Sequence, residues 1–430
     1  MNKTVILLGG SNSVIKNGLQ KGLKESIETL NDNGGGGLEF YNLALGSTTC
    51  IQSLYELKRA KNQQIFKNAK LIITESNIND SSKHHLQKCP LSVIFRNLTW
   101  YYKELYFLQK PILVLLLPLP ENFYSHSRKI NDFHKKLCIQ FGFNIIDVQA
   151  YADETNLLNF LTQKDPAHIQ ARIMREFGKN IIKNIKHFKQ SKKLKGKNDN
   201  PKFIILSPKD MCLEFKNLQA KRMRNSMYDE LAYELTQQTS LTILPNLKGY
   251  KIIALHSFTS FDFNHFCFIF LKNKKQIIQK EMAMSNCLAG LSSDFIIDDE
   301  SFLSLKCAKK ADIVEKHELV SGEFYHFDSL NLISIFLAKE NQTKSNFKLQ
   351  KSTLKIPKKY NFNHLIPPID IYKEIVDESV LNEPYLSQKL GQALINAYKN
   401  WHKGALLKFF LYEVWQIKRE FQAKKTEKQD

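Results

Sequence analysis

Short apolar runs alternate with longer amphipathic segments through the first 190 residues of the chain. Five of the runs have the length and composition of buried strands. They cover residues 3–8, 38–45, 69–75, 112–117 and 142–148. Apolar residues recur at helical spacing over residues 14–30, 50–67, 96–109 and 166–188. Strands that alternate with helices, several of them wholly apolar, predict a parallel sheet that helices cover on both faces.

The pattern changes at a basic stretch, residues 191–202, which holds almost no apolar side chain and is typical of a linker. Beyond it, short apolar runs separated by polar turns predict a mainly β accessory domain over residues 203–370. Apolar positions at helical spacing then predict a helical C-terminal segment over residues 371–430. We therefore expect an α/β domain at 1–190, followed by a β domain and a helical end.

The composition favours a cytoplasmic protein with several hydrophobic cores. Hydrophobic residues make up 43% of the 430 residues, but no run reaches the roughly 18 apolar residues of a membrane span. The N-terminus enters a strand at once and lacks the features of a signal peptide. The seven cysteines are widely spaced and form no Cys-x-x-Cys pair, which indicates a reducing compartment and neither a disulfide framework nor a zinc site.

The formal net charge of +20 comes from lysine-rich stretches spread along the chain. Such charge attracts nucleic acid, anionic lipid or phosphorylated substrates. Because no nucleic-acid-binding motif accompanies it, we favour a solvated lysine-rich surface and expect no nucleic-acid partner.

Small and polar residues follow the first three predicted strands, where parallel α/β sheets carry their sites. Ser11 follows Gly9-Gly10 after the first strand, Gly46 follows the second, and Glu75-Ser-Asn-Ile-Asn-Asp80 follows the third. Asp165-Pro-Ala-His168 opens the predicted last helix. Each piece alone is better explained by capping or turn chemistry. Their joint order along the chain favours a catalytic site, in which Asp165 orients His168 and His168 takes a proton from Ser11.

This arrangement resembles the SGNH (GDSL-like) hydrolase superfamily over about residues 1–190. The resemblance implies a flavodoxin-like three-layer α/β/α domain with a parallel sheet, and a triad of Ser11, Asp165 and His168. It also implies an oxyanion hole made by the Ser11 and Gly46 backbone N–H groups and the Asn79 side chain. We expect no cofactor, and no metal site either, because His84-His85 has no carboxylate or cysteine at ligand spacing.

Two positions depart from the family pattern. The chain has Gly-Gly-Ser where the family usually has Gly-Asp-Ser, so the Asp that often braces the loop is missing. Gly10 in its place would admit a bulkier substrate beside the nucleophile. Asn77 stands where a glycine is often found and is a second candidate donor to the oxyanion.

A second resemblance, over residues 386–412, is to a tail of bacterial surface-glycan biosynthesis proteins. The triad predicts an esterase or O-acyltransferase, and the tail resemblance predicts its pathway, which is the modification of surface polysaccharide such as capsule or lipo-oligosaccharide. The expected substrate is an acylated glycan or a carbohydrate acceptor with an acyl donor. Alternatively, the site moves a phosphorus-containing group from a nucleotide-linked donor to a capsular sugar hydroxyl. A third alternative is a non-catalytic glycan-binding or assembly protein. The basic C-terminus would also suit peripheral contact with an anionic inner-membrane surface.

Overall fold

The computed structural model describes most of residues 2–369 and a few residues beyond them. The described ranges are 2–34, 37–120, 123–194, 196–213, 218–260, 265–283, 285–316, 325–340, 354–369, 393, 408 and 412–419. Met1–Pro367 forms one compact unit and Pro368–Asp430 a second. In the second unit, residues 412–419 are helical, in line with the predicted helical end. Most of residues 386–412, which carry the glycan-biosynthesis resemblance, lie outside the described part of the chain.

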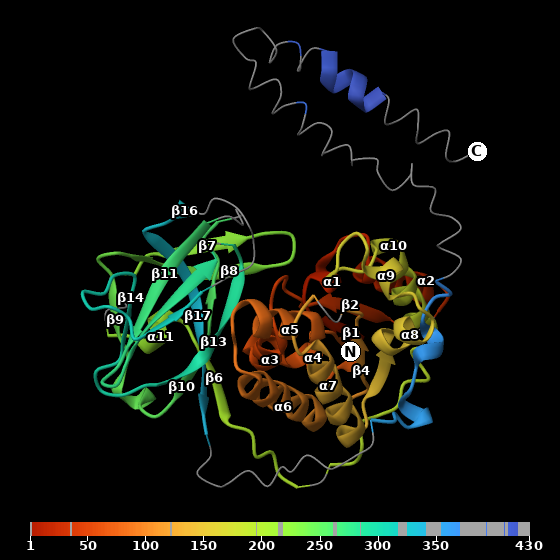
Figure 1. The fold of residues 1–430 in the computed structure, drawn as a ribbon, viewed down its shortest axis with the longest axis horizontal. Helices are drawn as coiled ribbons and strands as arrows, with labels where there is room; N and C mark the ends of the chain where they lie inside the picture. The colour runs from red at the N-terminus through yellow and green to blue at the C-terminus, as the bar shows by residue number, and fades with distance from the viewer. Residues whose placement is uncertain are drawn as a thin grey trace. The chain divides into compact units, whose positions relative to one another are not determined.

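The N-terminal part of the first unit is a three-layer α/β/α domain around a parallel sheet (Figure 1). The sheet has the order β2-β1-β3-β4-β5, which is the flavodoxin-like order, and all of its pairs are parallel. Its strands are β1 (Lys3–Leu8), β2 (Leu38–Asn42), β3 (Ala69–Thr74), β4 (Ile112–Leu116) and β5 (Asn144–Asp147). The five predicted strands and the predicted fold class are confirmed.

The helices of this domain number ten in the described residues, with one 3-10 turn. They are α1 (Ser11–Val14), α2 (Leu19–Asp32), α3 (Cys50–Lys58), η1 (Ala60–Asn62), α4 (Gln63–Lys67), α5 (Asn77–Leu86), α6 (Leu91–Phe107), α7 (Ser127–Phe141), α8 (Val148–Glu154), α9 (Leu158–Thr162) and α10 (Ala171–Lys183). The helix predicted over residues 50–67 is broken near Arg59, and α10 begins at Ala171 where the sequence predicted Pro166.

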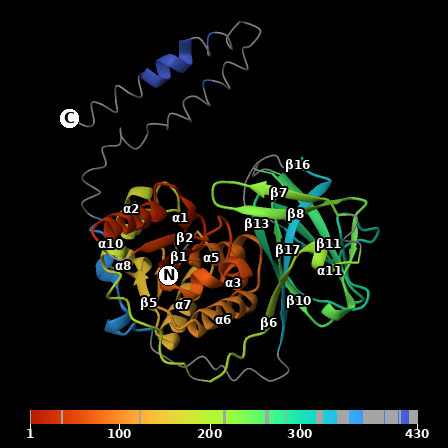
Figure 2. The same ribbon diagram turned by 180° about the vertical axis from the view of Figure 1, so that it is seen from behind.

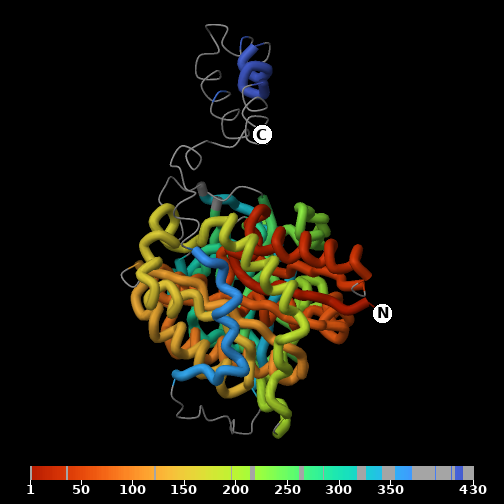
Figure 3. Tube along the Cα trace, turned by 90° about the vertical axis from the view of Figure 1, so that its right-hand side faces the viewer, coloured from red at the N-terminus to blue at the C-terminus, as the bar shows by residue number. Residues whose placement is uncertain are grey.

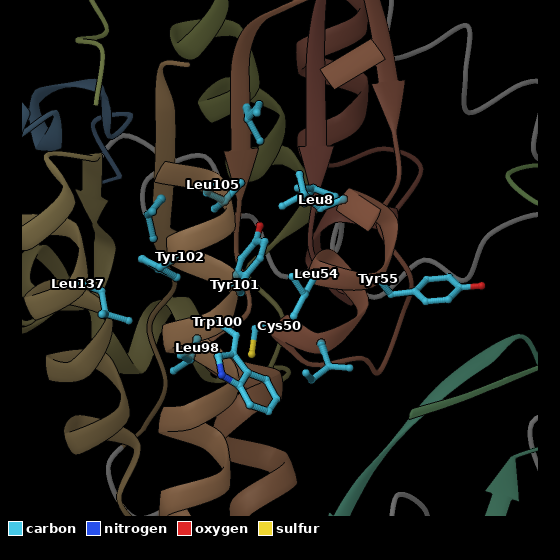
Figure 4. Packing of buried hydrophobic residues seen from close by; sticks show 14 of the residues in the cluster. Leu8, Cys50, Leu54, Tyr55, Leu98, Trp100, Tyr101, Tyr102, Leu105 and Leu137 are labelled. Atoms are coloured by element: carbon cyan, nitrogen blue, oxygen red, sulfur yellow. The ribbon is translucent and has the colours of Figure 1, made fainter. Parts of the chain in front are cut away.

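Successive residues of a strand face opposite sides of the sheet, so each strand contributes to two cores. On one face, Leu8 packs with Leu54 of α3 and with Tyr101 and Leu105 of α6 (Figure 4). Helices α2 and α10 lie on the other side of the sheet and touch each other closely. A side chain at Gly22 would come within 1.9 Å of the Arg175 carbonyl oxygen, so this helix crossing requires glycine.

The second part of the unit is a sandwich of two six-stranded sheets (Figures 1 and 2). One sheet has the order β13-β10-β17-β8-β7 with β6 beside β17, and the other β15-β12-β11-β14-β9 with β16 beside β11. The first contains β6 (Lys202–Leu206), β7 (Ala220–Arg224), β8 (Asp229–Thr236), β10 (Lys251–Ser257), β13 (Cys287–Ile296) and β17 (Ser329–Lys339). The second contains β9 (Ser240–Thr242), β11 (His265–Lys272), β12 (Ile277–Ala283), β14 (Phe302–Ser304), β15 (Ile313–Glu315) and β16 (Tyr325–His326).

Short helical turns accompany these strands: α11 (Pro208–Met211), η3 (Pro245–Leu247), η4 (Lys358–Tyr360) and η5 (Asn363–Leu365). Leu255 and Ile335 from one sheet and Ile269 and Ile278 from the other belong to one buried apolar cluster, which makes the sandwich core. The predicted mainly β region is confirmed.

Segments on both sides of the sandwich pack along the α/β domain. The basic stretch predicted as a linker is tied to it, because the Asn200 side chain donates to the Trp100 carbonyl oxygen at 2.9 Å and Lys103 pairs with Asp199 at 2.7 Å. Residues 354–367 return to the edge strand β5, where the Phe362 N–H donates to the Ile145 carbonyl oxygen at 2.9 Å. Figure 3 shows this blue segment crossing the face of the domain. By contacts it belongs with the α/β domain, although composition placed it with the β region.

Candidate active site

Ser11 is the first residue of α1, directly after β1 at the carboxyl edge of the sheet. Its Oγ lies 2.6 Å from His168 Nε2, and His168 Nδ1 lies 2.6 Å from Asp165 Oδ2. A carboxylate that accepts the Nδ1 proton leaves Nε2 as the acceptor for the serine proton. The structure therefore brings together the three residues that the sequence predicted as a triad.

The Asp165–His168 pair lies in a turn that precedes α10, and not in the first turn of the helix as predicted. Asp165 Oδ1 accepts from the Ala167 N–H at 2.9 Å, which closes a turn on the acid itself. Gln170 is extended, at φ −49° and ψ 130°, so the helix starts one residue later. The acid and base therefore sit on a loop whose shape depends on contacts outside the helix.

Asn12, the residue after the serine, provides those contacts. Its side chain donates to the Ala167 carbonyl oxygen at 2.9 Å and accepts from the Ile169 N–H at 3.2 Å. Asn12 is buried, so these two bonds fix the His168 loop from both sides against the start of α1. No pattern in the sequence predicted this role of Asn12.

Asn79, on the first turn of α5, lines a cavity together with Ser11 and His168. A side chain at Gly10 would meet the Asn79 amide at 2.7 Å. The missing side chain at Gly10 therefore makes room for Asn79, which corrects the expectation that it makes room for a bulkier substrate. Among the described residues, none forms a hydrogen bond with the Asn79 side chain, so its amide is available to a ligand.

Gly46 follows β2 and lines a second cavity that also reaches Ser11. The loop before it is held to the serine loop, because the Leu45 N–H donates to the Gly9 carbonyl oxygen at 3.0 Å. No described residue accepts the Gly46 N–H. The first N–H groups of a helix also lack acceptors within it, which includes that of Ser11. Three donors thus surround the serine: two backbone N–H groups and the Asn79 amide.

Asn77, the second candidate donor, points away from Ser11. Its amide nitrogen donates to the Leu117 carbonyl oxygen at 2.8 Å and to Asn131 Oδ1 at 2.9 Å. Its oxygen accepts from the Leu117 N–H at 3.1 Å. Asn77 therefore joins α5 to the end of β4 and to α7, and has no amide hydrogen left for an oxyanion.

A buried ionisable network supports α5 below Asn79. Asp80 is fully buried; its Oδ2 accepts from Ser76 Oγ at 2.8 Å and its Oδ1 from the Cys50 N–H at 3.2 Å. His134 Nε2 lies 3.4 Å from the same carboxylate. These contacts fix the first turn of α5 against α3 and α7, and with it the position of Asn79.

Glu75 braces the serine loop in place of the missing Asp. Its Oε1 accepts from the Gly10 N–H at 2.8 Å and from Ser13 Oγ at 2.9 Å. A side chain at Gly9 would lie 2.6 Å from the same oxygen, so the carboxylate fills the space that a side chain would need. Burial raises the pKa of Glu75 to about 7, although the bonds from Ser13 and Gly10 oppose the rise. Glu75 begins the polar block after the third predicted strand, but its own role could not be predicted from the sequence.

The raised pKa of Glu75 predicts a specific pH dependence of stability. The pKa of this carboxyl is 4.5 in the unfolded chain and about 7 in the folded protein, so the folded state holds the proton more tightly. Its contribution to stability is therefore complete below pH 4.5 and is lost as the pH rises through 7. We expect Glu75→Gln to gain stability relative to wild type as pH rises from 5 to 8, by on the order of 3 kcal/mol. Urea unfolding at each pH measures this difference.

Glu39 is the control for that experiment. It is exposed and its pKa is lowered by the hydrogen bond from Asn2 and then that from Tyr41. Its stabilising effect is therefore complete above pH 4.5, and the difference between Glu39→Gln and wild type stays constant from pH 5 to 8. A Glu75→Gln difference that is equally constant over this range contradicts the assignment of a raised pKa to Glu75.

Two cavities meet at Ser11. The larger, of about 490 Å³, lies between the serine and the β sandwich, and much of its wall is apolar. Its apolar lining is Val14, Ala44, Leu45, Met227, Tyr228, Phe258, Phe266, Ala283 and Cys287. The smaller, of about 240 Å³, lies on the His168 side, and most of the residues that line it are polar. The β region, in which no residue stood out from the sequence, therefore supplies much of one wall of the site.

Tyr228 of the β region also holds the loop that carries Gly46. Its buried hydroxyl donates to the Ala44 carbonyl oxygen at 2.9 Å and accepts from Gln52 Nε2 at 3.4 Å. Nearby, Arg59 donates two hydrogen bonds to Glu230, at 2.8 and 2.5 Å. These buried contacts fix the sandwich against α3 and place Tyr228 behind the Gly46 loop.

No three His, Cys, Asp or Glu side chains converge in a metal-binding group within the described ranges. His84 and His126 do approach each other, with Nε2 and Nδ1 3.1 Å apart, but both are half-exposed or exposed and no carboxylate joins them. All seven cysteines are free thiols. None of the helices in the described ranges has the length and hydropathy that crossing a membrane requires.

No protein-family model and no curated protein matches the sequence. Solved structures with a similar fold over part of the chain include TesA (17% identity, TM-score 0.34, 43% of this chain and 98% of TesA). They also include the acetyl xylan esterase AlAXEase (16% identity, TM-score 0.33, 42% of this chain and 97% of that one). A third is a lipase/acylhydrolase from Enterococcus faecalis (14% identity, TM-score 0.34, 44% of this chain and 97% of that one). Each likeness covers less than half of this chain, so the chemistry of the site follows from its own geometry.

Proposed function

We propose that the chain is an SGNH-type serine esterase or O-acyltransferase with Ser11 as its nucleophile. The observation that carries the proposal is the hydrogen-bonded line from Ser11 through His168 to Asp165, with 2.6 Å at each step. A serine hydroxyl bonded to a histidine that a carboxylate orients is activated for covalent catalysis. The three donors around Ser11 add the electrostatic stabilisation that acyl transfer requires.

The proposed reaction proceeds in two halves. His168 Nε2 takes the Ser11 proton while Ser11 Oγ bonds to the carbonyl carbon of the ester, and the Ser11 and Gly46 N–H groups and the Asn79 amide bind the resulting oxyanion. The tetrahedral intermediate collapses, the bond to the alcohol oxygen breaks, and His168 gives its proton to that oxygen. Water or a sugar hydroxyl then attacks the acyl carbon and loses its proton to His168. The bond from that carbon to Ser11 Oγ breaks, and His168 returns the proton to Ser11 Oγ.

The larger cavity is the proposed seat of the acyl group. It opens at Ser11 beside Gly46, and the apolar side chains of Met227, Phe258 and Phe266 line its wall from the β region. Burial of an acyl chain there contributes roughly 0.8 kcal/mol per methylene. The cavity therefore favours an acyl group longer than acetyl.

A series of 4-nitrophenyl esters from acetate to decanoate tests this proposal. We expect kcat/KM to rise with chain length by about fourfold per methylene until the cavity is filled, and then to fall. Ala283→Leu narrows the cavity from β12, so the octanoate-to-acetate ratio of kcat/KM is expected to drop about tenfold.

Ala220→Leu is the matched control, because Ala220 is exposed on β7 and does not line the cavity. It adds the same side chain to the same region and is expected to keep the wild-type ratio. A chain-length profile that Ala283→Leu leaves unchanged would place the acyl group elsewhere.

The proposed natural substrate is an acylated surface glycan, or a glycan hydroxyl that accepts the acyl group. This part of the proposal depends on the sequence resemblance of residues 386–412 to the tail of bacterial surface-glycan biosynthesis proteins. Modification of capsule or lipo-oligosaccharide at the inner face of the membrane, and peripheral contact with that membrane, remain predictions from the sequence.

A second candidate function is transfer of a phosphorus-containing group from a nucleotide-linked donor to a sugar hydroxyl. Lys83, which lines the smaller cavity with Ser11 and His168, is the observation that favours it. In this reaction Ser11 Oγ would bond to phosphorus and the nucleoside phosphate would leave with the proton from His168. Mass spectrometry of the Ser11 peptide after incubation with each donor distinguishes an acyl adduct from a phosphorus adduct.

A further inference from the structure

The smaller cavity is where the leaving group of the proposed reaction must lie. His168 lines this cavity and not the larger one, and His168 Nε2 is the atom that protonates the departing oxygen. If the acyl chain occupies the apolar cavity, the other half of the substrate extends into the polar one. Its recognition therefore depends on what surrounds the smaller cavity.

A buried lysine, Lys83, lines that cavity, and a second buried lysine, Lys280, interacts with it electrostatically. Lys83, on α5, donates to Gln87 Oε1 at 2.5 Å and to the Gly290 carbonyl oxygen of the β sandwich at 3.0 Å. Lys280, on β12, is 1% exposed and pairs with Glu315 at 3.1 Å. Lys83 and Lys280 act on each other electrostatically, so two ammonium groups share one carboxylate.

The single carboxylate is already well satisfied. Glu315 accepts from the Ser292 N–H at 2.9 Å and from the Ser293 N–H at 2.7 Å, in addition to Lys280. Burial alone would raise the pKa of Glu315, but Lys280, then Lys83 and then the Ser292 N–H hold it below its ordinary value. Glu315 is therefore ionised and balances one of the two lysines.

The second positive charge has no counterpart in the described surroundings. The Cys89 thiol also acts on Lys83, but burial raises its pKa, so it brings no negative charge at neutral pH. Burial and then the charge of Lys280 lower the pKa of Lys83 to about 7. A buried charge without a partner is costly, and an anion in the cavity would remove that cost.

We infer that the smaller cavity binds an anionic group, a carboxylate or a phosphate, on the leaving half of the substrate, and that Lys83 is its binding residue. The inference builds on the proposed function, since it takes Ser11 as nucleophile and His168 as the acid. It narrows the substrate to esters whose alcohol half carries a negative charge next to the scissile bond. Gln87 and the Gly290 carbonyl oxygen hold the Lys83 ammonium in place by accepting its hydrogen bonds.

Two esters of equal shape test the inference. The butyrate esters of 4-hydroxybenzoate and of 4-hydroxybenzamide differ in the charge of the leaving group. The wild-type protein is expected to hydrolyse the carboxylate ester with at least about tenfold higher kcat/KM, and Lys83→Met is expected to lower that ratio about tenfold or more. Lys83→Arg keeps the charge and is expected to keep a preference for the carboxylate ester.

Lys209→Met is the matched control, because Lys209 is an exposed lysine on α11 that does not line the cavity. It makes the same change in net charge and is expected to leave the ratio as in wild type. An equal ratio in wild type and in Lys83→Met overturns the inference while leaving the proposed function intact. If wild type hydrolyses neither ester, the proposed function itself fails.

Calorimetric titration with inorganic phosphate and with 4-hydroxybenzoate gives a second measurement that does not depend on catalysis. The Ser11→Ala protein is expected to bind one or both anions, and the Ser11→Ala, Lys83→Met protein to bind neither. The anion that binds more tightly tells whether phosphate or carboxylate is the recognised group. Equal binding in both proteins, or no binding of either anion to Ser11→Ala, overturns the inference. Lys83→Gln replaces Lys83→Met if the latter does not fold.

Discussion

Replacing Ser11 by alanine is expected to lower kcat for hydrolysis of 4-nitrophenyl butyrate by about 10⁴-fold or more, and His168→Ala is expected to have a similar effect. The two side chains form one unit, with Ser11 Oγ 2.6 Å from His168 Nε2, so the loss of either removes the same chemical step. The double variant is therefore expected to be no slower than the slower single variant. Initial rates of nitrophenol release measure all three.

The chain contains a second Ser–His pair that serves as a control. His85 Nδ1 lies 3.1 Å from Ser125 Oγ, but this pair is exposed and lacks a carboxylate partner. Ser125→Ala is expected to keep wild-type rates. Ester hydrolysis that survives Ser11→Ala and His168→Ala would contradict the triad and place the esterase activity elsewhere in the chain.

The strands of the α/β domain could be predicted because their sequence and their burial agree. Runs such as residues 112–117 are apolar throughout, and in the structure every residue of β4 is buried. A strand that is buried on both faces requires an apolar residue at every position, and a run of this length is too short for a buried helix. The alternation of strands and helices predicts a parallel sheet, and the resemblance to the SGNH superfamily implies its flavodoxin-like strand order.

The helix α5 could not be predicted because its buried face is polar. Asn77, Asp80 and Ser81 are buried, and each is held by hydrogen bonds. A helix that packs through polar groups has no apolar period for sequence reasoning to find. The stretch was therefore predicted as loop or cap chemistry, although it carries Asn79 and Lys83.

The triad could be predicted because its parts follow strand ends and because Asp165 and His168 are three residues apart. The contacts that shape the site could not, since they join distant segments. Asn12 binds the loop of Ala167, and Glu75 braces Gly10 across 65 residues. The wall that Tyr228 adds comes from another part of the fold, 184 residues from Ala44. Spacing along the chain carries no information about such pairs.

Replacing Asn79 by alanine is expected to lower kcat for 4-nitrophenyl butyrate by about 10²–10³-fold with little change in KM. The Asn79 amide lies against the Gly10 backbone beside Ser11, where the oxyanion of the proposed reaction forms. A donor that binds charge only in the transition state contributes to kcat and not to substrate binding. Steady-state kinetics separate the two parameters.

Asn77→Ala is the matched control for this prediction. Asn77 is also a buried asparagine on the first turn of α5, but its amide is committed to Leu117 and Asn131. Its loss is expected to cost about 1–3 kcal/mol of stability, because the Leu117 N–H and carbonyl oxygen lose their partner. At a temperature where both variants are folded, Asn77→Ala should retain most of its kcat. If the two variants lose kcat equally, the loss comes from α5 as a whole, and Asn79 is not the oxyanion donor.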